Sequence, residues 1–469
     1  MGWLLPQTVR FLTGGAGTAW YNMAERETWT TRIGFIFAAV GSAVGLGNIW
    51  SFPFQTGSNG GAAFLVVYLA IVLLFGFPAM LMEFVIGRGS NQNPISAFRE
   101  LGFGNWSFAG TLGVVSSMVT LAFYSVIGGW VLSYIAGSAT GAYFGNAGGF
   151  FGSVSASPLA VGTHAVFMAV TIAIVAFGIE NGIERATKVM IPAIVVLLLG
   201  LGVWGTTLDG ASAAYTYYLS PDFGYIADNL ASIIPSAVGQ AFFTLSLGFS
   251  VMIAYASYLG RDDSLPADGG AIVVINTLVA LLAGFVVFPV LFANGIDPGS
   301  GGIPTTFVSL ATAFGELPGG RLLGVVFFVV LLLAALSSAI SLLETPTSYI
   351  VDRYDYSRKT VAGVLGGIIF LLGVPTALST STLSWYNAIV FSLLLPLVVL
   401  LFALFVGWVA YDSSSEELQL GTSLGDGFAT LWLWWVRLVI PVGIGLTLVL
   451  GVQDLLVKAG VLEAAVILG

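Results

Sequence analysis

The chain has 469 residues, of which 57% are hydrophobic and only 8% are charged. This composition excludes a soluble globular domain and predicts an all-α polytopic protein that crosses the lipid bilayer many times. There is no cysteine, which excludes disulfides, thiol catalysis and Cys-ligated metals, and the single histidine, His164, cannot build a metal site alone. The net charge of −9 argues against nucleic acid as a partner.

We interpret eleven apolar segments as membrane spans. In chain order they are 33–54, 62–87, 108–138, 163–179, 188–206, 231–258, 270–292, 321–350, 361–375, 384–410 and 431–451. Residues 1–25 contain no spanning segment and are expected to form a cytoplasmic N-terminal segment. The tail 452–469 is apolar but short and carries charged residues, so we expect it not to span.

The basic residues predict how the chain is oriented. With the N-terminus in the cytoplasm, Lys and Arg fall in inner loops or at inner helix ends, and only Arg321 and Lys458 fall outside. The reverse orientation would place nearly every basic loop outside. We therefore expect a multi-pass protein of the cell (plasma) membrane with a cytoplasmic N-terminus.

The first apolar segment contains three glycines, Gly41, Gly45 and Gly47, within seven residues. Glycine destabilises a helix, and backbone groups freed at bilayer depth are tolerated only where protein or a water-filled cavity satisfies them. The pattern predicts a helix that breaks at the midplane and turns its amides and carbonyls toward a ligand. Alternatively, Gly41 and Gly45 form a GxxxG pair that packs two helices together.

A second stretch of the same character, at residues 243–250, interrupts the sixth segment. Five helices followed by five more, each set opening with a broken helix, is typical of a 5+5 inverted repeat with a midplane binding site. We assign a ten-helix transporter core to 26–410, with repeats at about 26–206 and 231–410. Residues 411–469 are expected to form a cytoplasmic loop, the eleventh helix and a short tail.

Three long loops, 139–162, 207–230 and 293–320, are expected to lie outside. In the last of them, the Pro/Gly-rich stretch 297–304 precedes a short apolar run. This run is either a helical lid or a plain loop.

The polar groups near the two breaks are almost all neutral. Glu83 and Glu344 are the only acids inside the spans, and neither lies at a break. Freed carbonyls and neutral side-chain oxygens suit a hard monovalent cation, and half-helix N-termini favour an anionic group on a substrate. Together they indicate sodium-coupled uptake of an amino acid. The alternatives are hydroxyls bonded to their own helices and asparagines that join helices.

Several long motifs carry a resemblance to a known family. They are Arg32-Ile33-Gly34, residues 41–53, Asn59-Gly60-Gly61, Glu83 with Gly87-Arg88, Phe123-Tyr124, residues 239–248, residues 255–258, Asn276 and residues 334–339. At these positions the chain resembles the neurotransmitter:sodium symporters, a family that includes the bacterial leucine transporter. The resemblance extends from about Arg26 to Gly451 and implies a leucine-transporter-like fold with helices 1 and 6 broken.

The resemblance also implies a substrate site and two sodium sites. The substrate site would comprise Ser42, Ala43, Gly45, Thr120, Tyr124, Phe243, Thr244, Ser246, Phe249, Ser338 and Leu342. One sodium would bind the Ala43 carbonyl, Asn48, Thr244, Asn276 and the substrate carboxylate. The other would bind the carbonyls of Gly41, Val44 and Ala334 and the hydroxyls of Ser337 and Ser338.

Gates and a structural acid are implied in the same way. Arg26 and Asp352, with Ser257 and Tyr258, match the cytoplasmic gate, although Arg26 and Asp352 are alternatively two solvated interface charges. Glu83 would accept hydrogen bonds from the unwound backbone near Phe249 and Ser250.

Three departures from the family pattern concern the outer gate, the substrate and chloride. Ser51 stands where the family usually has Arg or Lys, and its partner acid aligns with Asn387, so both outer-gate charges are missing. Gly45 replaces the Asp of monoamine carriers, which favours amino acids over amines. Ala280 replaces a chloride-site Ser, while Tyr68, Gln240 and Thr244 match the rest of that site, so chloride dependence stays open.

The sequence therefore predicts a symporter that imports a neutral, apolar amino acid by alternating access. The alternative is a membrane sensor or transceptor that binds an amino acid without net transport. No pore-lining charge ring indicates a channel, and no nucleophile–base pair or P-loop indicates an enzyme. The particular amino acid and the oligomeric state stay open.

Overall fold

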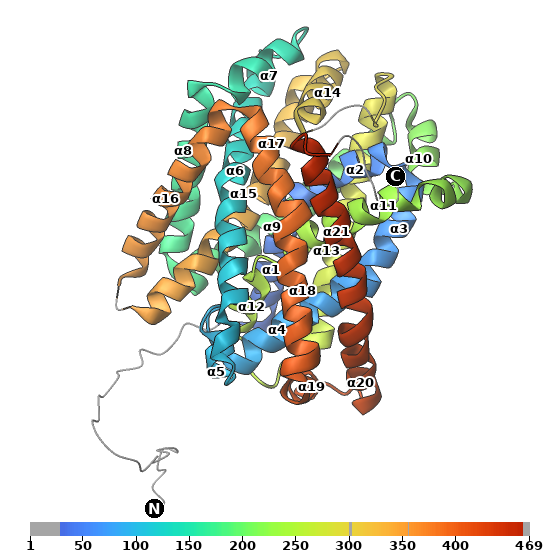
Figure 1. The fold of residues 1–469 in the computed structure, drawn as a ribbon. Helices are drawn as coiled ribbons and strands as arrows, with labels where there is room; N and C mark the ends of the chain where they lie inside the picture. The colour runs from blue at the N-terminus through green and yellow to red at the C-terminus, as the bar shows by residue number, and fades with distance from the viewer. Residues whose placement is uncertain (1–28, 300–302, 355, 463–469) are drawn as a thin grey trace, which may run out of the picture.

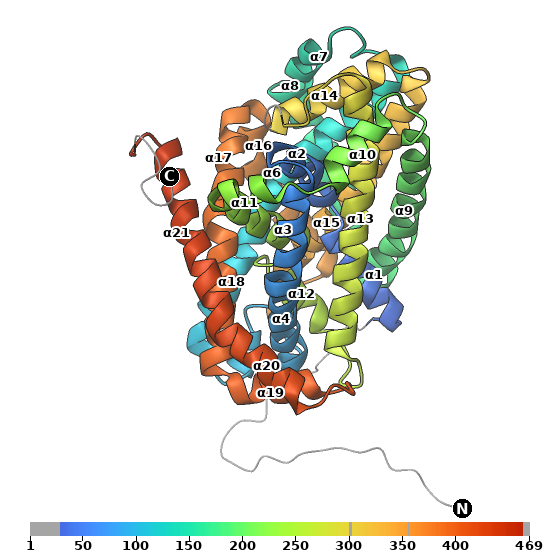
Figure 2. The ribbon, with the colours of Figure 1, turned by 90° about the vertical axis from the view of Figure 1, so that its right-hand side faces the viewer.

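The computed structural model describes residues 29–299, 303–354 and 356–462, and all regular structure within them is helical. The helices form one elongated bundle (Figures 1 and 2), in which the C-terminal half of α1 and all of α12 are buried. We name the two ends of the bundle by their elements: the upper end carries α7 and α14, and the lower end carries α5 and α19.

The first half of the chain forms the following elements: α1 (Arg32–Ala43), η1 (Gly47–Ser51), α2 (Phe52–Ser58), α3 (Ala62–Ile71), η2 (Val72–Gly76), α4 (Phe77–Ser90), α5 (Ala97–Glu100), η3 (Gly104–Trp106), α6 (Ser107–Thr140), α7 (Ala147–Ser155), α8 (Pro158–Ala176), η4 (Ile179–Glu184) and α9 (Arg185–Gly205). Several of the η elements are wide turns inside a longer helix, so α3, η2 and α4 form one span from Ala62 to Ser90.

The second half forms the following elements: α10 (Ala211–Leu219), α11 (Phe223–Thr244), α12 (Val251–Ala256), α13 (Leu265–Ala293), α14 (Ile303–Glu316), α15 (Gly320–Arg353), α16 (Arg358–Leu378), α17 (Thr380–Ile389), η5 (Val390–Leu394), α18 (Leu395–Leu404), η6 (Phe405–Val409), α19 (Tyr411–Gln419), α20 (Asp426–Trp434), η7 (Trp435–Val439) and α21 (Ile440–Lys458).

The described residues contain 9 helices long and apolar enough to cross a membrane, or 10 when the bent pair Arg32–Ala43 and Gly47–Ser58 is counted as one span. The sixth predicted span, 231–258, is not a continuous helix, because α11 ends at Thr244 and α12 begins at Val251. The last span runs from Asp426 to Lys458, so the helix continues past the predicted end at residue 451.

The two breaks have different backbone causes. At the first, α1 ends at Ala43 and Val44 is extended (φ −78°, ψ 94°). The helical halves Arg32–Ala43 and Gly47–Ser58 are bent by 48° relative to each other. At the second, Gly248 has φ +80°, but Ser246 (φ 55°) and Ser250 (φ 59°) are also left-handed. A left-handed serine is strained, and such strain collects at functional sites.

Each of the three long loops carries a helix, namely α7, α10 and α14. The apolar run that follows the Pro/Gly-rich stretch 297–304 therefore belongs to a helix, α14, and is not a plain loop. α14 packs against α7, α13 and α15 at the upper end of the bundle (Figure 1).

Candidate functional site

The amides that the first break frees are satisfied by side chains. The Gly45 amide donates to Asn48 Oδ1 at 3.1 Å, and the Leu46 amide donates to the Tyr124 hydroxyl at 3.0 Å. Tyr124 lies on α6, so this bond fixes the break against a helix of 34 residues. The Tyr124 hydroxyl accepts in this bond, which leaves its own proton to donate elsewhere.

The second break is held by a buried acid. The Gly248 amide donates to Glu83 Oε1 at 2.8 Å, and Glu83 is 1% exposed. The expectation placed the donors near Phe249 and Ser250, one or two residues further along the chain. The hydrogen bond to Gly248 gives this acid a structural role at the break.

Hydroxyl groups join both breaks to α15. The Ser246 hydroxyl donates to the Ser42 carbonyl oxygen at 2.9 Å, and the Ser338 hydroxyl donates to the same oxygen at 2.8 Å. The Ser42 hydroxyl also lies 2.7 Å from that of Ser341. Because this carbonyl lies near the end of α1, the freed backbone oxygen is paired with the second break, through Ser246, and with α15, through Ser338.

A small cavity lies between the two breaks. It is lined by Ser42, Ala43, Gly45, Gly47, Thr120, Tyr124, Phe243, Ser246, Phe249, Ser338 and Leu342. All but one of the predicted substrate residues are among them; Thr244 is replaced by Gly47. The space open to the centre of a water molecule is about 10 Å³, which is about one water.

Aromatic rings enclose this cavity. The ring centres of Tyr124 and Phe243 lie 6.5 Å apart, and those of Phe243 and Phe249 lie 6.4 Å apart. Phe243 also packs on Phe391 at 4.5 Å. The three aromatic residues of the predicted substrate site, Tyr124, Phe243 and Phe249, therefore form one continuous aromatic contact.

The four protein groups of the first predicted sodium site lie together. One end of the Asn276 side-chain amide lies 3.1 Å from the Thr244 carbonyl oxygen, 3.2 Å from that of Ala43 and 2.8 Å from Asn48 Nδ2. Both asparagines are fully buried. Amide and carbonyl groups of α1, η1, α11 and α13 thus converge on one point.

The second predicted sodium set is only partly assembled by hydrogen bonds. The Ser337 hydroxyl donates to the Val44 carbonyl oxygen at 3.1 Å and to that of Ala334 at 2.9 Å. Ser338 instead bonds to Ser42. A side chain at Gly41 would meet Thr187 on α9, so this glycine allows α1 and α9 to pack closely.

Two residues of the predicted outer gate and chloride site, Ser51 and Gln240, are hydrogen-bonded to each other at the first broken helix. The Ser51 hydroxyl donates to Gln240 Oε1 at 2.8 Å, and Gln240 Nε2 donates to the Gly47 carbonyl oxygen at 2.8 Å. Tyr68 is fully buried. Asn387 is half-buried on α17. Gln240, and not Asn387, is therefore the partner that the structure gives to Ser51.

At the lower end, the predicted gate residues have partners of their own. Arg26 lies outside the described residues. Asp352 accepts a hydrogen bond from Asn93 Nδ2 at 3.2 Å, and the Ser257 hydroxyl donates to the Ala254 carbonyl oxygen at 2.6 Å. Asp352 is thus bonded to the segment before α5 and is not simply solvated.

The second acid inside the spans is also paired at this end. The Tyr258 hydroxyl donates to Glu344 Oε1 at 3.4 Å. The Arg358 guanidinium contacts Glu344 Oε2 at 2.7 Å. Glu344 is fully buried, and the arginine compensates its charge.

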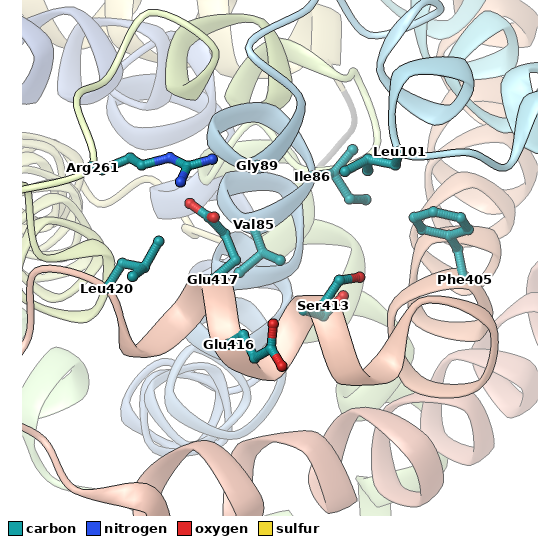
Figure 3. A pocket seen from close by; sticks show the side chains of 11 residues that line it. Val85, Ile86, Gly89, Leu101, Arg261, Phe405, Ser413, Glu416, Glu417 and Leu420 are labelled. Carbon is teal, nitrogen blue, oxygen red and sulfur yellow. The ribbon is translucent and has the colours of Figure 1, made fainter. Parts of the chain in front are cut away.

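A larger cavity at the lower end was not anticipated from the sequence. It lies between α4 and α19 and has about 330 Å³ open to the centre of a water molecule (Figure 3). Beside it, buried Arg88 pairs with Glu417 at 2.5 Å and donates to the carbonyl oxygens of Asp263 and Glu417. The signal that could have found this contact is Arg88 itself, a charged residue inside the apolar helix Ala62–Ser90, because a charge in such a helix needs a partner.

The fold and the central site together define a class. A membrane-spanning bundle with two broken helices around a midway cavity of hydroxyls, amides and aromatic rings is built to bind a small solute and its coupling ions. The model of the sodium:neurotransmitter symporter family matches residues 26–144 and 158–458. The chain belongs to this family.

Named relatives agree with this assignment. An uncharacterized sodium-dependent transporter of Bacillus subtilis, YhdH, is 37% identical over 443 residues, which cover 90% of this chain and 97% of the relative. Another, from Haemophilus influenzae, is 33% identical over 451 residues, which cover 90% of this chain and 97% of that relative. The crystal structure of MhsT in complex with L-phenylalanine matches with a TM-score of 0.82 and 39% identity, covering 90% of this chain and 99% of that one.

These findings confirm a sodium-coupled symporter with a leucine-transporter-like fold, and a transporter rather than an enzyme. Nothing in them supports the sensor alternative.

Proposed function

We propose that this symporter imports a neutral, apolar amino acid by alternating access, with the upper end of the bundle outside the cell and the lower end in the cytoplasm. The observation that carries the proposal is the cavity between the two breaks, which is lined by residues of the breaks, by hydroxyl groups and by aromatic and aliphatic side chains. The distribution of Lys and Arg supports the orientation.

The carboxylate of the substrate would bind beside Gly45 and the Tyr124 hydroxyl. A side chain at Gly45 would come within 2.2 Å of Ser338 Oγ and 2.7 Å of the Tyr124 hydroxyl oxygen, so only glycine leaves this space open. The Tyr124 hydroxyl uses a lone pair to accept from the Leu46 amide, so that bond leaves the hydroxyl proton free to be donated to the substrate. This arrangement supports an amino acid over an amine.

The side chain of the substrate would point toward Phe249, Phe243 and Leu342. The described residues that line this cavity carry no charge, so among them a charged substrate side chain would find no counter-ion. MhsT, which matches over 99% of its length, is described with bound L-phenylalanine. Both points support a neutral, apolar side chain.

Two sodium ions would bind at the predicted sets. The Ala43 and Thr244 carbonyl oxygens converge on Asn276 beside Asn48, and those of Val44 and Ala334 on Ser337. Neutral oxygens suit a monovalent ion, because the protein ligands of the two sets include no carboxylate to compensate a second charge. The Gln240 amide is already bonded to Gly47 and Ser51, so chloride has no part in this proposal.

The test is uptake of labelled neutral amino acids into proteoliposomes with and without an inward sodium gradient. We expect accumulation that needs sodium and that Asn48→Ala abolishes, while Asn229→Ala, at a partly exposed residue of α11, transports normally. Sodium-dependent binding without accumulation would support the sensor alternative. Uptake of amines or charged amino acids instead would contradict the assigned substrate class.

A further inference from the structure

An arginine walled by aromatic rings lies far from the central cavity, at the lower end of the bundle. Arg437 on η7 lies against η6, and its Nε donates to the Gly407 carbonyl oxygen. Its guanidinium carbon lies 4.5 Å from the ring centre of Tyr411, 5.4 Å from that of Trp434 and 5.7 Å from that of Trp408. We call these four side chains the Arg437 cluster.

The Arg437 cluster faces outward, where one membrane span ends. Tyr411 is 39% exposed, Trp434 52% and Trp408 57%. The span that contains η6 ends at Val409, and the chain then enters α19 at the lower end (Figures 1 and 2). Trp and Tyr rings gather at the boundary between hydrocarbon and headgroups. The cluster therefore lies at headgroup level.

Most donors of this guanidinium have no partner among the described residues. Arginine carries five N–H donors, and Nε uses one of them on Gly407. The terminal nitrogens form no hydrogen bond or ion pair with any described residue; their other contacts are the three rings. At the edge of the hydrocarbon, unmet donors are costly. These nitrogens require an acceptor from outside the chain.

We propose that the Arg437 cluster binds the phosphate of a phospholipid headgroup, with an anionic headgroup preferred. The planar guanidinium matches phosphate in a two-bond fork, and the ring faces hold it in one orientation before the lipid arrives. Basic pockets between membrane helices are suited to anionic headgroups. The exposed ring faces beside the arginine contact the acyl chains, which a free phosphate ion lacks.

A second cation on an aromatic ring in the same helical span supplies a matched control. Lys458 lies 5.0 Å from the ring centre of Trp385 at the upper end of the bundle. Its Nζ donates to the carbonyl oxygen and the hydroxyl of Ser384, each at 2.8 Å. This ammonium has protein acceptors, so its removal tests loss of a surface cation without loss of the proposed site.

The experiment is native mass spectrometry of the full chain in neutral detergent, titrated with dioleoyl phosphatidylglycerol or dioleoyl phosphatidylcholine. We expect the wild type to retain phosphatidylglycerol preferentially. Arg437→Gln should bind it on the order of tenfold more weakly, as for one charge-assisted hydrogen bond lost. Lys458→Gln should bind as the wild type does. A parallel titration with inorganic phosphate separates the lipid from the free ion.

Three results would overturn the proposal: unchanged phosphatidylglycerol binding in Arg437→Gln, an equal loss in Lys458→Gln, or full competition by inorganic phosphate at the lipid concentrations used. If Arg437→Gln fails to fold, Trp434→Ala takes its place, because that ring is half exposed and removing it opens one wall. Phosphatidylglycerol binding by Trp434→Ala equal to that of the wild type would likewise overturn the proposal.

Discussion

Ser51 on the first broken helix donates a 2.8 Å hydrogen bond to Gln240 on α11, and Gln240 donates in turn to the Gly47 carbonyl oxygen. The upper halves of the two broken helices are thus joined by neutral groups, at a position where the family usually carries an arginine or lysine. A neutral hydrogen bond contributes about 1 kcal/mol, so this link between the two upper halves is weak.

Ser51→Ala should shift the transporter toward outward-open states by about fivefold, as expected for about 1 kcal/mol. The chain contains no cysteine, so a single Thr120→Cys reporter in the central cavity can be labelled with an impermeant maleimide. We expect faster labelling in Ser51→Ala and wild-type labelling in Ser51→Thr, which keeps the hydroxyl.

The same reporter tests whether charges can replace this link. Ser51→Arg with Asn387→Asp should slow labelling, because an ion pair would add to the closure by Tyr124 and Phe243. An unchanged rate in the double variant would count against Asn387 as the partner position. In the structure, the hydrogen-bond partner of Ser51 is Gln240.

Gly45→Ala should abolish amino-acid binding while the protein still folds. The added methyl would come within 2.2 Å of Ser338 Oγ and 2.7 Å of the Tyr124 hydroxyl oxygen, where the substrate carboxylate is proposed to bind. Gly200→Ala is the matched control, because no atom lies within 4 Å of its added methyl. The measurement is isothermal titration of the amino acid in sodium buffer; retained affinity in Gly45→Ala would move the carboxylate elsewhere.

Sodium should stabilise the wild type against heat, and Asn276→Ala should lose part of that stabilisation. An ion that binds only the native state raises its apparent stability with concentration. We expect a smaller rise of the melting temperature with sodium in Asn276→Ala and in Ser337→Ala, compared with potassium at equal ionic strength. Equal rises in both variants and the wild type would contradict the two sodium sets.

How much of this structure the sequence predicts depends on how far apart in the chain the interacting residues are. The breaks were predictable because glycines are local signals, and most of the cavity lining followed from the family motifs. The left-handed Ser246 and Ser250 carry no such signal, since serine normally avoids that region. The partner of Ser51 was missed because the resemblance pointed to Asn387, and nothing local indicated Gln240.

The lower-end contact between Arg88 and Glu417 shows the same limit, since 329 residues separate the two in the chain. The Arg88 side chain is 0% exposed and that of Glu417 10%, and the guanidinium also bonds to the Asp263 carbonyl oxygen. One buried arginine therefore ties α4 to α19 and to the loop after α12. That loop leads away from the second break, so this contact holds its lower half in place.

Glu417→Gln should lower the free energy of unfolding by on the order of 3 kcal/mol, because it leaves the Arg88 charge buried without its counter-charge. Glu416→Gln, at the neighbouring exposed acid whose side chain Figure 3 shows beside the same cavity, should change it little. Thermal unfolding in detergent compares the two. Replacing both partners, as in Arg88→Met with Glu417→Leu, should recover much of the loss, since an apolar pair leaves no unpaired charge. If Glu417→Gln unfolds like Glu416→Gln, the Arg88 contact does not hold the lower end together, and α19 is fixed by its apolar packing alone.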